Sequence, residues 1–121
     1  RYPKINLHYE INLKGLPKEN EIVSITSYRI IQECLTNIAR HAKAKNIEIR
    51  VAYIKKNKSS AMIDIEVIDD GVGFNKSHRD GFGLTGMRER INAINGKINI
   101  VSEINHGVKF NIQLPIFMKK K

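Results

Sequence analysis

The sequence of 121 residues predicts an α+β fold, a two-layer sandwich in which a mixed, mostly antiparallel five-stranded sheet carries helices on one face. Three observations support this class. Five segments alternate between apolar and polar residues, as half-buried strands do. Two longer segments repeat apolar residues every three to four positions, as amphipathic helices do. Their order is strand, helix, strand, strand, helix, strand, strand, which favours antiparallel hairpins.

The expected strands share a two-residue period and end at turn residues. Turn composition at 57–60 separates the second strand from the third, so residues 47–68 are expected to form a hairpin. A further turn at 105–107 separates the last two strands. We place the strands at residues 5–13, 47–53, 61–67, 98–101 and 108–114.

The first helix is expected over about residues 21–44, with Ser24 or Thr26 capping its start. The second is expected over residues 84–94, ending at Asn95-Gly96 in a left-handed C-cap. The face of the first helix expected to be buried consists of Tyr28, Ile31, Leu35, Ile38 and Ala42, widened by Ile30 and Cys34.

A second face of the first helix is polar. It combines a carboxylate, an amide, a guanidinium and an imidazole at steps of three and four residues. Taken alone, this pattern is more typical of a solvated helix face with a weak surface pair between Glu33 and Asn37. The members of this face are Glu33, Asn37, Arg40, His41 and Ala44.

The rest of the chain is organised around the stretch from Ile63 to Met87. Its strand runs into an acidic, glycine-rich turn at 69–73; a polar loop at 75–80 follows, and a second glycine-rich turn at 81–87 opens the second helix. Glycine allows close backbone approach, and N–H groups at a helix start attract phosphate. The stretch predicts a nucleotide pocket with a mobile flap, with two ordinary surface turns as the alternative.

Composition restricts the class of protein. The net charge is +9, but the basic residues are scattered and show no spacing typical of nucleic-acid-binding modules, so direct nucleic-acid binding is the weaker alternative. Cys34 is the only cysteine, which excludes a disulfide framework and suits a reducing cytosol. No run reaches the roughly 18 apolar residues of a membrane helix. The chain lacks an initiator Met, so we expect it to be part of a longer protein.

Three segments, in one order, resemble the motifs of the GHKL ATP-binding (Bergerat) fold. Residues 32–42, QECLTNIARHA, resemble its N box. Asp69-x-Gly71-x-Gly73-Phe74 resembles its first glycine box, and residues 81–90, GFGLTGMRER, resemble its second. The sequences of these motifs are similar to those of bacterial sensor histidine kinases that signal to response regulators of the LuxR/NarL type. The resemblance extends from about Tyr28 to Pro115.

The resemblance implies a binding site for ATP and Mg²⁺. It makes Asn37 the Mg²⁺ ligand, Asp69 the acceptor for the adenine amino group and Glu33 a catalytic residue. Val108 stands where the family often has a threonine that supports adenine. The residues implied in ATP binding are Asn37, Arg40, His41, Lys43, Asp69, Gly71, Gly73, Phe74, Gly81, Gly83, Leu84, Thr85, Gly86 and Met87.

The resemblance also implies a function. Residues 1–121 would form a single catalytic domain, cytoplasmic and belonging to a membrane-bound sensor kinase, that donates the γ-phosphate of ATP to a histidine on a separate dimerisation domain. No histidine of this chain stands in a sequence similar to a phosphoacceptor site, so the chain is expected to bind ATP without phosphorylating itself. An ATPase or an anti-sigma-factor serine kinase on the same fold is the alternative.

Overall fold

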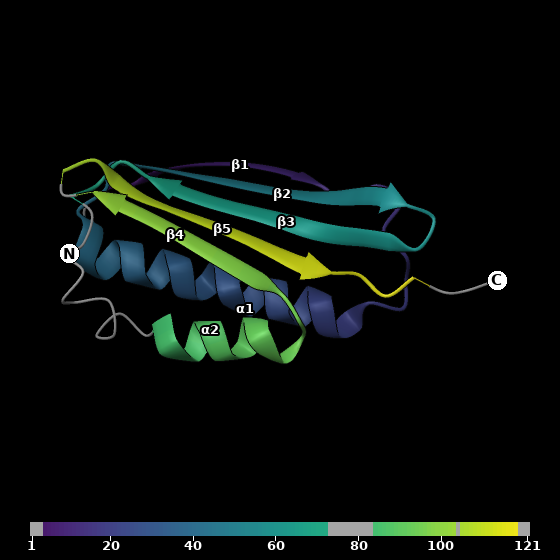
Figure 1. Ribbon diagram of the computed structural model, residues 1–121. Helices are drawn as coiled ribbons and strands as arrows, with labels where there is room; N and C mark the ends of the chain where they lie inside the picture. The colour runs from purple at the N-terminus through teal and green to yellow at the C-terminus, as the bar shows by residue number, and fades with distance from the viewer. Residues whose placement is uncertain (1–3, 73–83, 104, 119–121) are drawn as a thin grey trace.

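The computed structural model describes residues 4–72, 84–103 and 105–118. These residues form two layers, a twisted sheet and a layer of helices against one of its faces (Figure 1). The predicted fold class is therefore confirmed. None of the described helices is long and apolar enough to cross a membrane.

The sheet has the strand order β1-β2-β3-β5-β4. β1 runs parallel to β2, and the other three neighbouring pairs are antiparallel. The parallel pair makes the sheet mixed, as predicted. The elements are β1 (Asn6–Asn12), α1 (Glu21–Asn37), the π-helical segment η1 (Ile38–Ala42), β2 (Asn46–Asn57), β3 (Ser60–Asp69), α2 (Leu84–Ala93), β4 (Lys97–Glu103) and β5 (Gly107–Pro115).

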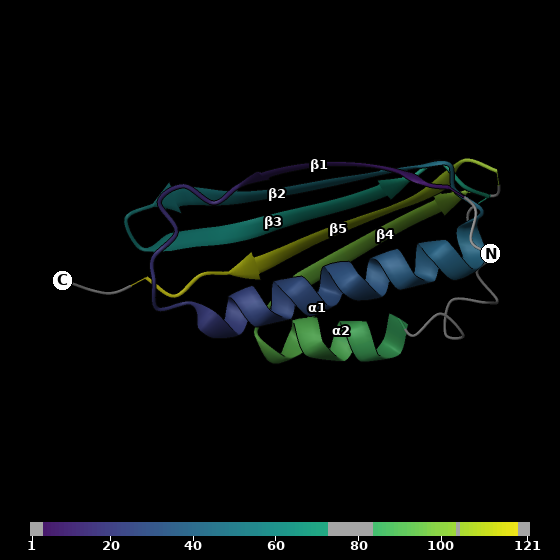
Figure 2. The same cartoon turned by 180° about the vertical axis from the view of Figure 1, so that it is seen from behind.

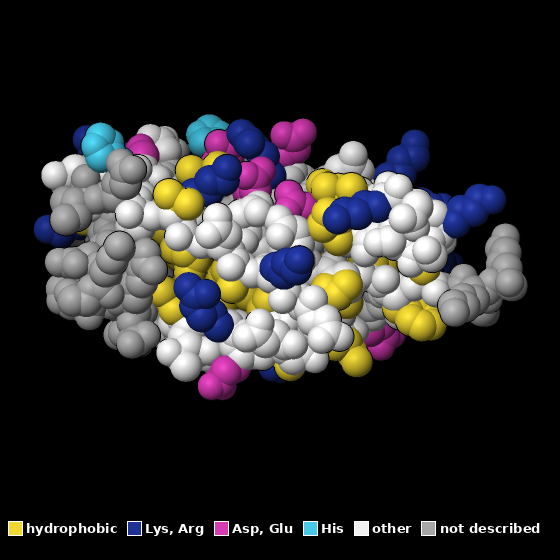
Figure 3. Space-filling view, viewed as in Figure 1, with side chains coloured by type: hydrophobic (Ala, Val, Ile, Leu, Met, Phe, Trp, Pro, Cys, Tyr) yellow, Lys and Arg dark blue, Asp and Glu magenta, His cyan; other side chains and the backbone are white. Residues whose placement is uncertain are grey.

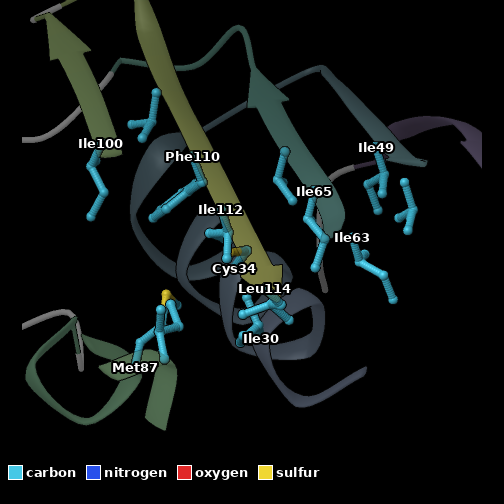
Figure 4. Packing of buried hydrophobic residues seen from close by; sticks show 14 of the residues in the cluster. Ile30, Cys34, Ile49, Ile63, Ile65, Met87, Ile100, Phe110, Ile112 and Leu114 are labelled. Atoms are coloured by element: carbon cyan, nitrogen blue, oxygen red, sulfur yellow. The ribbon is translucent and has the colours of Figure 1, made fainter. Parts of the chain in front are cut away.

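The core lies between the sheet and the helices. Val51, Ile65 and Ile112 are aligned across the three central strands, and all three are buried. Figure 4 shows apolar side chains of these strands pointing toward Ile30 and Cys34 of α1. The alternation predicted for β3 is confirmed: Ile63, Ile65 and Val67 are buried, while Asp64 and Glu66 lie on the opposite face and are half-buried.

The outer face of the sheet is polar and carries charges of both signs. Arg50 pairs with Glu48 at 2.6 Å, and Lys109 pairs with Glu66 at 3.0 Å. Figure 3 shows basic and acidic side chains interspersed on the visible face, without a continuous basic surface. This view agrees with the scattered positive charge of the sequence.

The buried face of α1 differs from the predicted one. Ile30, Cys34 and Ile38 are its centre, whereas Tyr28 is 67% exposed. The three- and four-residue steps define a stripe, but only contact with the sheet decides which part of that stripe is covered. Tyr28 lies on the flank of α1, beyond the partly buried Ile31.

The start of α1 also differs from the prediction. The helix begins at Glu21, so neither Ser24 nor Thr26 caps it. Asn20 precedes it, yet the Asn20 side chain makes no cap hydrogen bond. Its amide instead donates to the carbonyl oxygens of Pro17 and Phe117 and accepts the Phe117 N–H, which fixes the C-terminal segment beside the start of α1.

The end of the first helix is a π-helical segment rather than regular helix. η1 ends at Ala42, and Lys43 follows in the left-handed region with φ of 50°. The helix therefore stops before Ala44, which lies outside the polar face where it was predicted and is buried. At the end of α2, the left-handed residue is Asn95, with φ of 60°, as the predicted cap requires.

Candidate functional site

Three elements that carry predicted site residues meet at one end of the molecule. The C-terminal end of α1 with η1, the C-terminal end of β3 and the start of α2 lie there in both views (Figures 1 and 2). The two-layer arrangement thus brings parts of all three sequence motifs together. Gly73, Phe74, Gly81, Gly83 and the predicted flap at 75–80 lie outside the described residues.

Asp69 is the most unusual side chain at this end. It is the last residue of β3, and it is only 4% exposed. Its Oδ1 accepts the N–H of Gly71 at 2.7 Å, while its Oδ2 is buried without a hydrogen-bond partner among the described residues. Burial raises the pKa of Asp69, and the backbone N–H groups of Gly71 and Val108 act in the opposite direction. A buried acceptor without a donor is costly, by about 1–3 kcal/mol, and such groups often mark ligand sites.

Asp70, directly after Asp69, has a structural role that the sequence analysis missed. Its Oδ1 accepts the backbone N–H groups of Lys45 and Asn46, both at 2.9 Å, and its Oδ2 accepts the Asn46 side-chain amide at 2.7 Å. The Asn46 amide is the main reason that the pKa of Asp70 is lowered. Asp70 therefore joins the end of β3 to the chain that leaves η1. Only the acidic residue in a turn hinted at this role.

Gly107 is a second residue that the sequence analysis did not assign to the site. It opens β5 with φ of +82°, where a side chain is strained. A Cβ atom at this position would overlap the carbonyl oxygen of Asp69. Gly107 therefore allows the β4–β5 turn to lie directly against the residue that carries the buried carboxylate. Val108, the departure from the family pattern, is buried beside it and pairs with Asp69 in the β3–β5 ladder.

Asn37 and Glu33 lie on the flank of α1 that faces α2. Both are half-buried, so the solvated-face alternative does not describe them. Asn37 Nδ2 is buried without a partner among the described residues. Glu33 Oε1 pairs with the guanidinium of Arg90 on α2, while Glu33 Oε2 is buried and has no hydrogen-bond partner within residues 4–72, 84–103 and 105–118. Arg90 is the third site residue missed as such; its place in the second glycine box was the available signal.

The predicted phosphate contacts are placed less uniformly. Arg40 and Lys43 are exposed, and His41 lies in η1. On α2, Thr85 is exposed and Gly86 is half-buried. The side chains of Leu84 and Met87 pack in the hydrophobic core, so only their backbone groups can contact a ligand.

Comparison with known proteins places this arrangement in a family. Residues 23–117 match the family described as histidine kinase-, DNA gyrase B- and HSP90-like ATPases. The chain is 35% identical over 115 residues to the oxygen sensor histidine kinase NreB of Staphylococcus carnosus, covering 93% of this chain and 31% of NreB. It is 39% identical over 117 residues to the sensor histidine kinase YxjM of Bacillus subtilis, covering 95% of this chain and 27% of YxjM. The chain thus spans about a third or less of these relatives.

A solved structure has the same fold. The histidine kinase domain of the blue-light-activated histidine kinase of Erythrobacter litoralis superimposes with a TM-score of 0.66 at 16% identity, over 91% of this chain and 52% of that one. The matched family covers most of the chain, including all three motifs. The chain therefore belongs to the family of histidine kinase-, DNA gyrase B- and HSP90-like ATPases, and is one of its ATP-binding domains.

Proposed function

We propose that this chain is the ATP-binding catalytic domain of a bacterial sensor histidine kinase. Residues 1–121 form one domain that binds Mg–ATP and donates the γ-phosphoryl group to a histidine on a separate dimerisation and phosphoacceptor domain. The names of the relatives support this choice over an ATPase or an anti-sigma-factor serine kinase, since NreB and YxjM are both named sensor histidine kinases.

The observation that carries the proposal is the buried carboxylate of Asp69. The Gly71 N–H holds one carboxylate oxygen, and the other is buried with no hydrogen-bond donor in the part of the chain that the structure describes. The 6-amino group of adenine is a donor of the kind that this oxygen lacks. Guanine presents a carbonyl oxygen at the same position. Two acceptors would then face each other, which disfavours the binding of guanine. Asp69 therefore selects ATP over GTP.

The residues present also fit a single Mg²⁺ ion. Asn37 offers a half-buried amide, and its oxygen and nitrogen are interchangeable in assignment, so its oxygen can serve as the ligand. Among the described residues no group of three or more His, Cys, Asp or Glu could hold a metal. Mg²⁺ commonly takes one or two protein oxygens and completes its shell with phosphates and water. When bound, it neutralises phosphate charge.

The remaining motif residues are assigned by their chemistry. Arg40 and Lys43 follow Asn37 and supply positive charge for the phosphates, His41 supplies a ring N–H donor, and the glycine boxes at 71–74 and 81–87 supply backbone N–H groups. Glu33 is the candidate catalytic carboxylate. Its Oε2, which has no partner among the residues that the structure describes, is the atom that would accept a proton, since Arg90 engages the other oxygen.

The proposal extends to partners and location. The phosphoryl acceptor is the dimerisation domain of the same kinase, and the next acceptor is a response regulator of the LuxR/NarL type. The domain then works in the cytoplasm, linked to a membrane only through other regions of the kinase. The +9 net charge assists binding of an anionic nucleotide rather than nucleic acid.

Calorimetric titration tests the nucleotide assignment. We expect Mg–ATP to bind and GTP to bind at least about tenfold more weakly, because a charged hydrogen bond is worth about 1.5–3 kcal/mol. Asp69→Asn should reduce ATP affinity roughly tenfold to a hundredfold. Asp64→Asn is the matched control: it lies on the same strand but on the outer face, where its carboxylate bonds to Gln113 at 2.9 Å. Equal effects of the two substitutions would remove Asp69 from the adenine site.

Transfer of radiolabelled γ-phosphate tests the kinase assignment. Incubated alone with ATP, the chain should acquire no stable phosphohistidine. Addition of the phosphoacceptor domain of a sensor kinase relative should yield phosphohistidine on that added domain. A label on a histidine of the chain itself would contradict the assignment, and rapid release of free phosphate without transfer would favour the ATPase alternative.

A further inference from the structure

β1 (Asn6–Asn12) forms one edge of the sheet. Its only neighbour among the described strands is β2, and all seven of its residues are exposed. Figure 2 shows β1 along the margin of the sheet. An exposed and regular edge strand is a template for pairing with another strand.

The backbone of β1 offers a defined set of groups at this free edge. Asn6 donates its N–H to the carbonyl of Lys45 at 2.8 Å, in register with the parallel ladder that pairs Asn6 with Asn46. In a parallel ladder the residues that bond to one neighbour alternate with those that point away. Leu7, Tyr9 and Ile11 therefore direct their N–H and C=O groups to the free edge.

The side chains of the same three residues form an apolar row. Leu7, Tyr9 and Ile11 pair in register with the buried Ile47, Ile49 and Val51, so they lie on the face of the sheet that carries the helices. They are nevertheless 47%, 70% and 56% exposed, because α1 packs mainly under β3 and β5. The sheet thus extends beyond its helical layer and leaves this row uncovered.

The sequence of β1, NLHYEIN, is chemically symmetric about Tyr9. The residues at equal distances on either side of Tyr9 match in chemistry: an imidazole with a carboxylate, two aliphatic side chains and two amides. These pairs are His8 with Glu10, Leu7 with Ile11, and Asn6 with Asn12. We propose that two copies of this chain associate by antiparallel pairing of their β1 strands about a two-fold axis at Tyr9, which joins the two sheets into one. This inference does not rest on the proposed function.

The backbone and side-chain patterns select the same register. With Tyr9 opposite Tyr9 of a second copy, the three residues with free backbone groups meet as hydrogen-bonded pairs, giving six hydrogen bonds across the interface. His8 of each copy then faces the Glu10 carboxylate of the other copy. A two-fold axis at Glu10 would oppose two carboxylates, and one at His8 would oppose two imidazoles. Opposite charges across a strand pair stabilise it and like charges destabilise it.

The interface also covers the apolar row. Directly opposed residues of an antiparallel pair lie on one face, so Leu7, Tyr9 and Ile11 of both copies gather on the helical side, in the space between the two helical layers. One strand pair covers less than the roughly 1,200 Å² of a standard interface, so the expected dissociation constant is on the order of 0.1 mM. Such a contact requires high local concentration.

Sedimentation velocity of the chain between about 10 μM and 1 mM tests the proposal. We expect a monomer–dimer equilibrium. His8→Glu should weaken the dimer by about tenfold, since it sets two pairs of carboxylates opposite each other. Glu10→Lys should weaken it as well, because each His8 loses the carboxylate that it faces. The double variant His8→Glu/Glu10→Lys should restore it, because the charges again match. Glu19→Lys is the control: it makes the same charge change at an exposed position outside β1 and should leave the equilibrium unchanged.

A backbone variant makes the test independent of charge. Tyr9→Pro removes an N–H that points to the free edge and not one that bonds to β2, so it should abolish the dimer while the circular dichroism spectrum stays the same. A monomer at 1 mM, or a dimer unaffected by all of these changes, would overturn the proposal. So would a monomeric chain that binds a peptide of residues 5–13, since the edge would then accept a strand but not a second copy.

Discussion

Two adjacent carboxylates in this protein serve opposite purposes. Asp70 accepts three hydrogen bonds, and its pKa is lowered mainly by the Asn46 amide. Asp69 is buried, one of its oxygens has no hydrogen-bond partner in the described part of the chain, and its pKa is raised mainly by burial. Ionised Asp70 stabilises the fold, whereas ionised Asp69 costs stability that a ligand donor would recover. This contrast is what we expect when one side chain serves structure and its neighbour serves binding.

The contrast predicts opposite pH dependences. Because folding raises the pKa of Asp69, the unfolded state loses this proton first as pH rises, so the wild type should lose stability relative to Asp69→Asn above about pH 3.9. Because folding lowers the pKa of Asp70, its contribution is present above about pH 3.9 and is lost as pH falls through the folded-state pKa. Urea unfolding curves from about pH 3 to pH 7 measure how the contributions of Asp69 and Asp70 to the free energy of unfolding change with pH. Differences independent of pH would contradict this account.

Asn37 is the residue by which metal dependence can be examined. We expect Asn37→Ala to weaken ATP binding by about tenfold or more in the presence of Mg²⁺. Binding measured with a chelator present should change far less, because the amide acts through the metal. Asn92→Ala, an exposed amide on α2, is the matched control and should leave both values unchanged. Equal losses with and without Mg²⁺ would argue against a ligand role for Asn37.

At the scale of elements, the site depends on where turns and helix ends meet. The β4–β5 turn lies against the end of β3 through Gly107, and the last turn of α2 is joined to α1 through Arg90 and Glu33. The sequence distance between these segments is large, so their contact depends on the strand order. In particular, β5 lies between β3 and β4 and thereby places Gly107 beside Asp69.

Two glycine substitutions separate packing from ligand approach. Gly107→Ala should lower the free energy of unfolding by at least about 2 kcal/mol, because the backbone is left-handed and the new Cβ overlaps the Asp69 carbonyl. ATP affinity should fall with it. Gly86→Ala meets only the Arg90 guanidinium, at 3.8 Å, and should raise stability by about 0.5–1 kcal/mol. Chemical denaturation and calorimetry measure the two quantities separately.

The Gly86 variant also tests the second glycine box. If the backbone there approaches the phosphates, ATP affinity should fall although stability rises. An affinity equal to that of the wild type would place the phosphates elsewhere.

At the scale of the whole molecule, the two ends of the sandwich have different roles. One end is closed by Asn20, whose amide makes three hydrogen bonds that join the chain before α1 to Phe117. Toward the other end lie the buried side-chain polar atoms that have no hydrogen-bond partner among the described residues, on Asp69, Asn37, Glu33 and Arg90.

Ligand binding should therefore stabilise one end in particular. ATP at 100 times its dissociation constant should add about 2.7 kcal/mol and raise Tm by ~10 °C or more, measured by calorimetry. Hydrogen exchange should show new protection at residues 45–46, 70–72 and 107–108, and little change near Asn20. Uniform protection over the whole sheet would contradict a site confined to this end.

The sequence alone determined the elements and the motif chemistry. Alternation specified the strands and their inward faces, because the side-chain period of a strand depends on local geometry alone. Glycines and polar residues in a set order indicated the family, which the comparison with known proteins confirmed, and predicted the candidate ATP site, since backbone approach and phosphate charge require those residue types. Most strand limits agree with the structure within a few residues, although β2 extends to Asn57.

The tertiary structure decided what covers each face. Tyr28 is exposed and Ile30 is central because coverage of a helical stripe depends on where the sheet lies. Likewise Asp70 acquired its role through partners 24 or more residues away. Gly107 and Arg90 acquired theirs through partners on other elements. The free edge of β1 follows from the strand order. Periodicity reports which way a side chain points, but only the packed layers determine whether anything lies there.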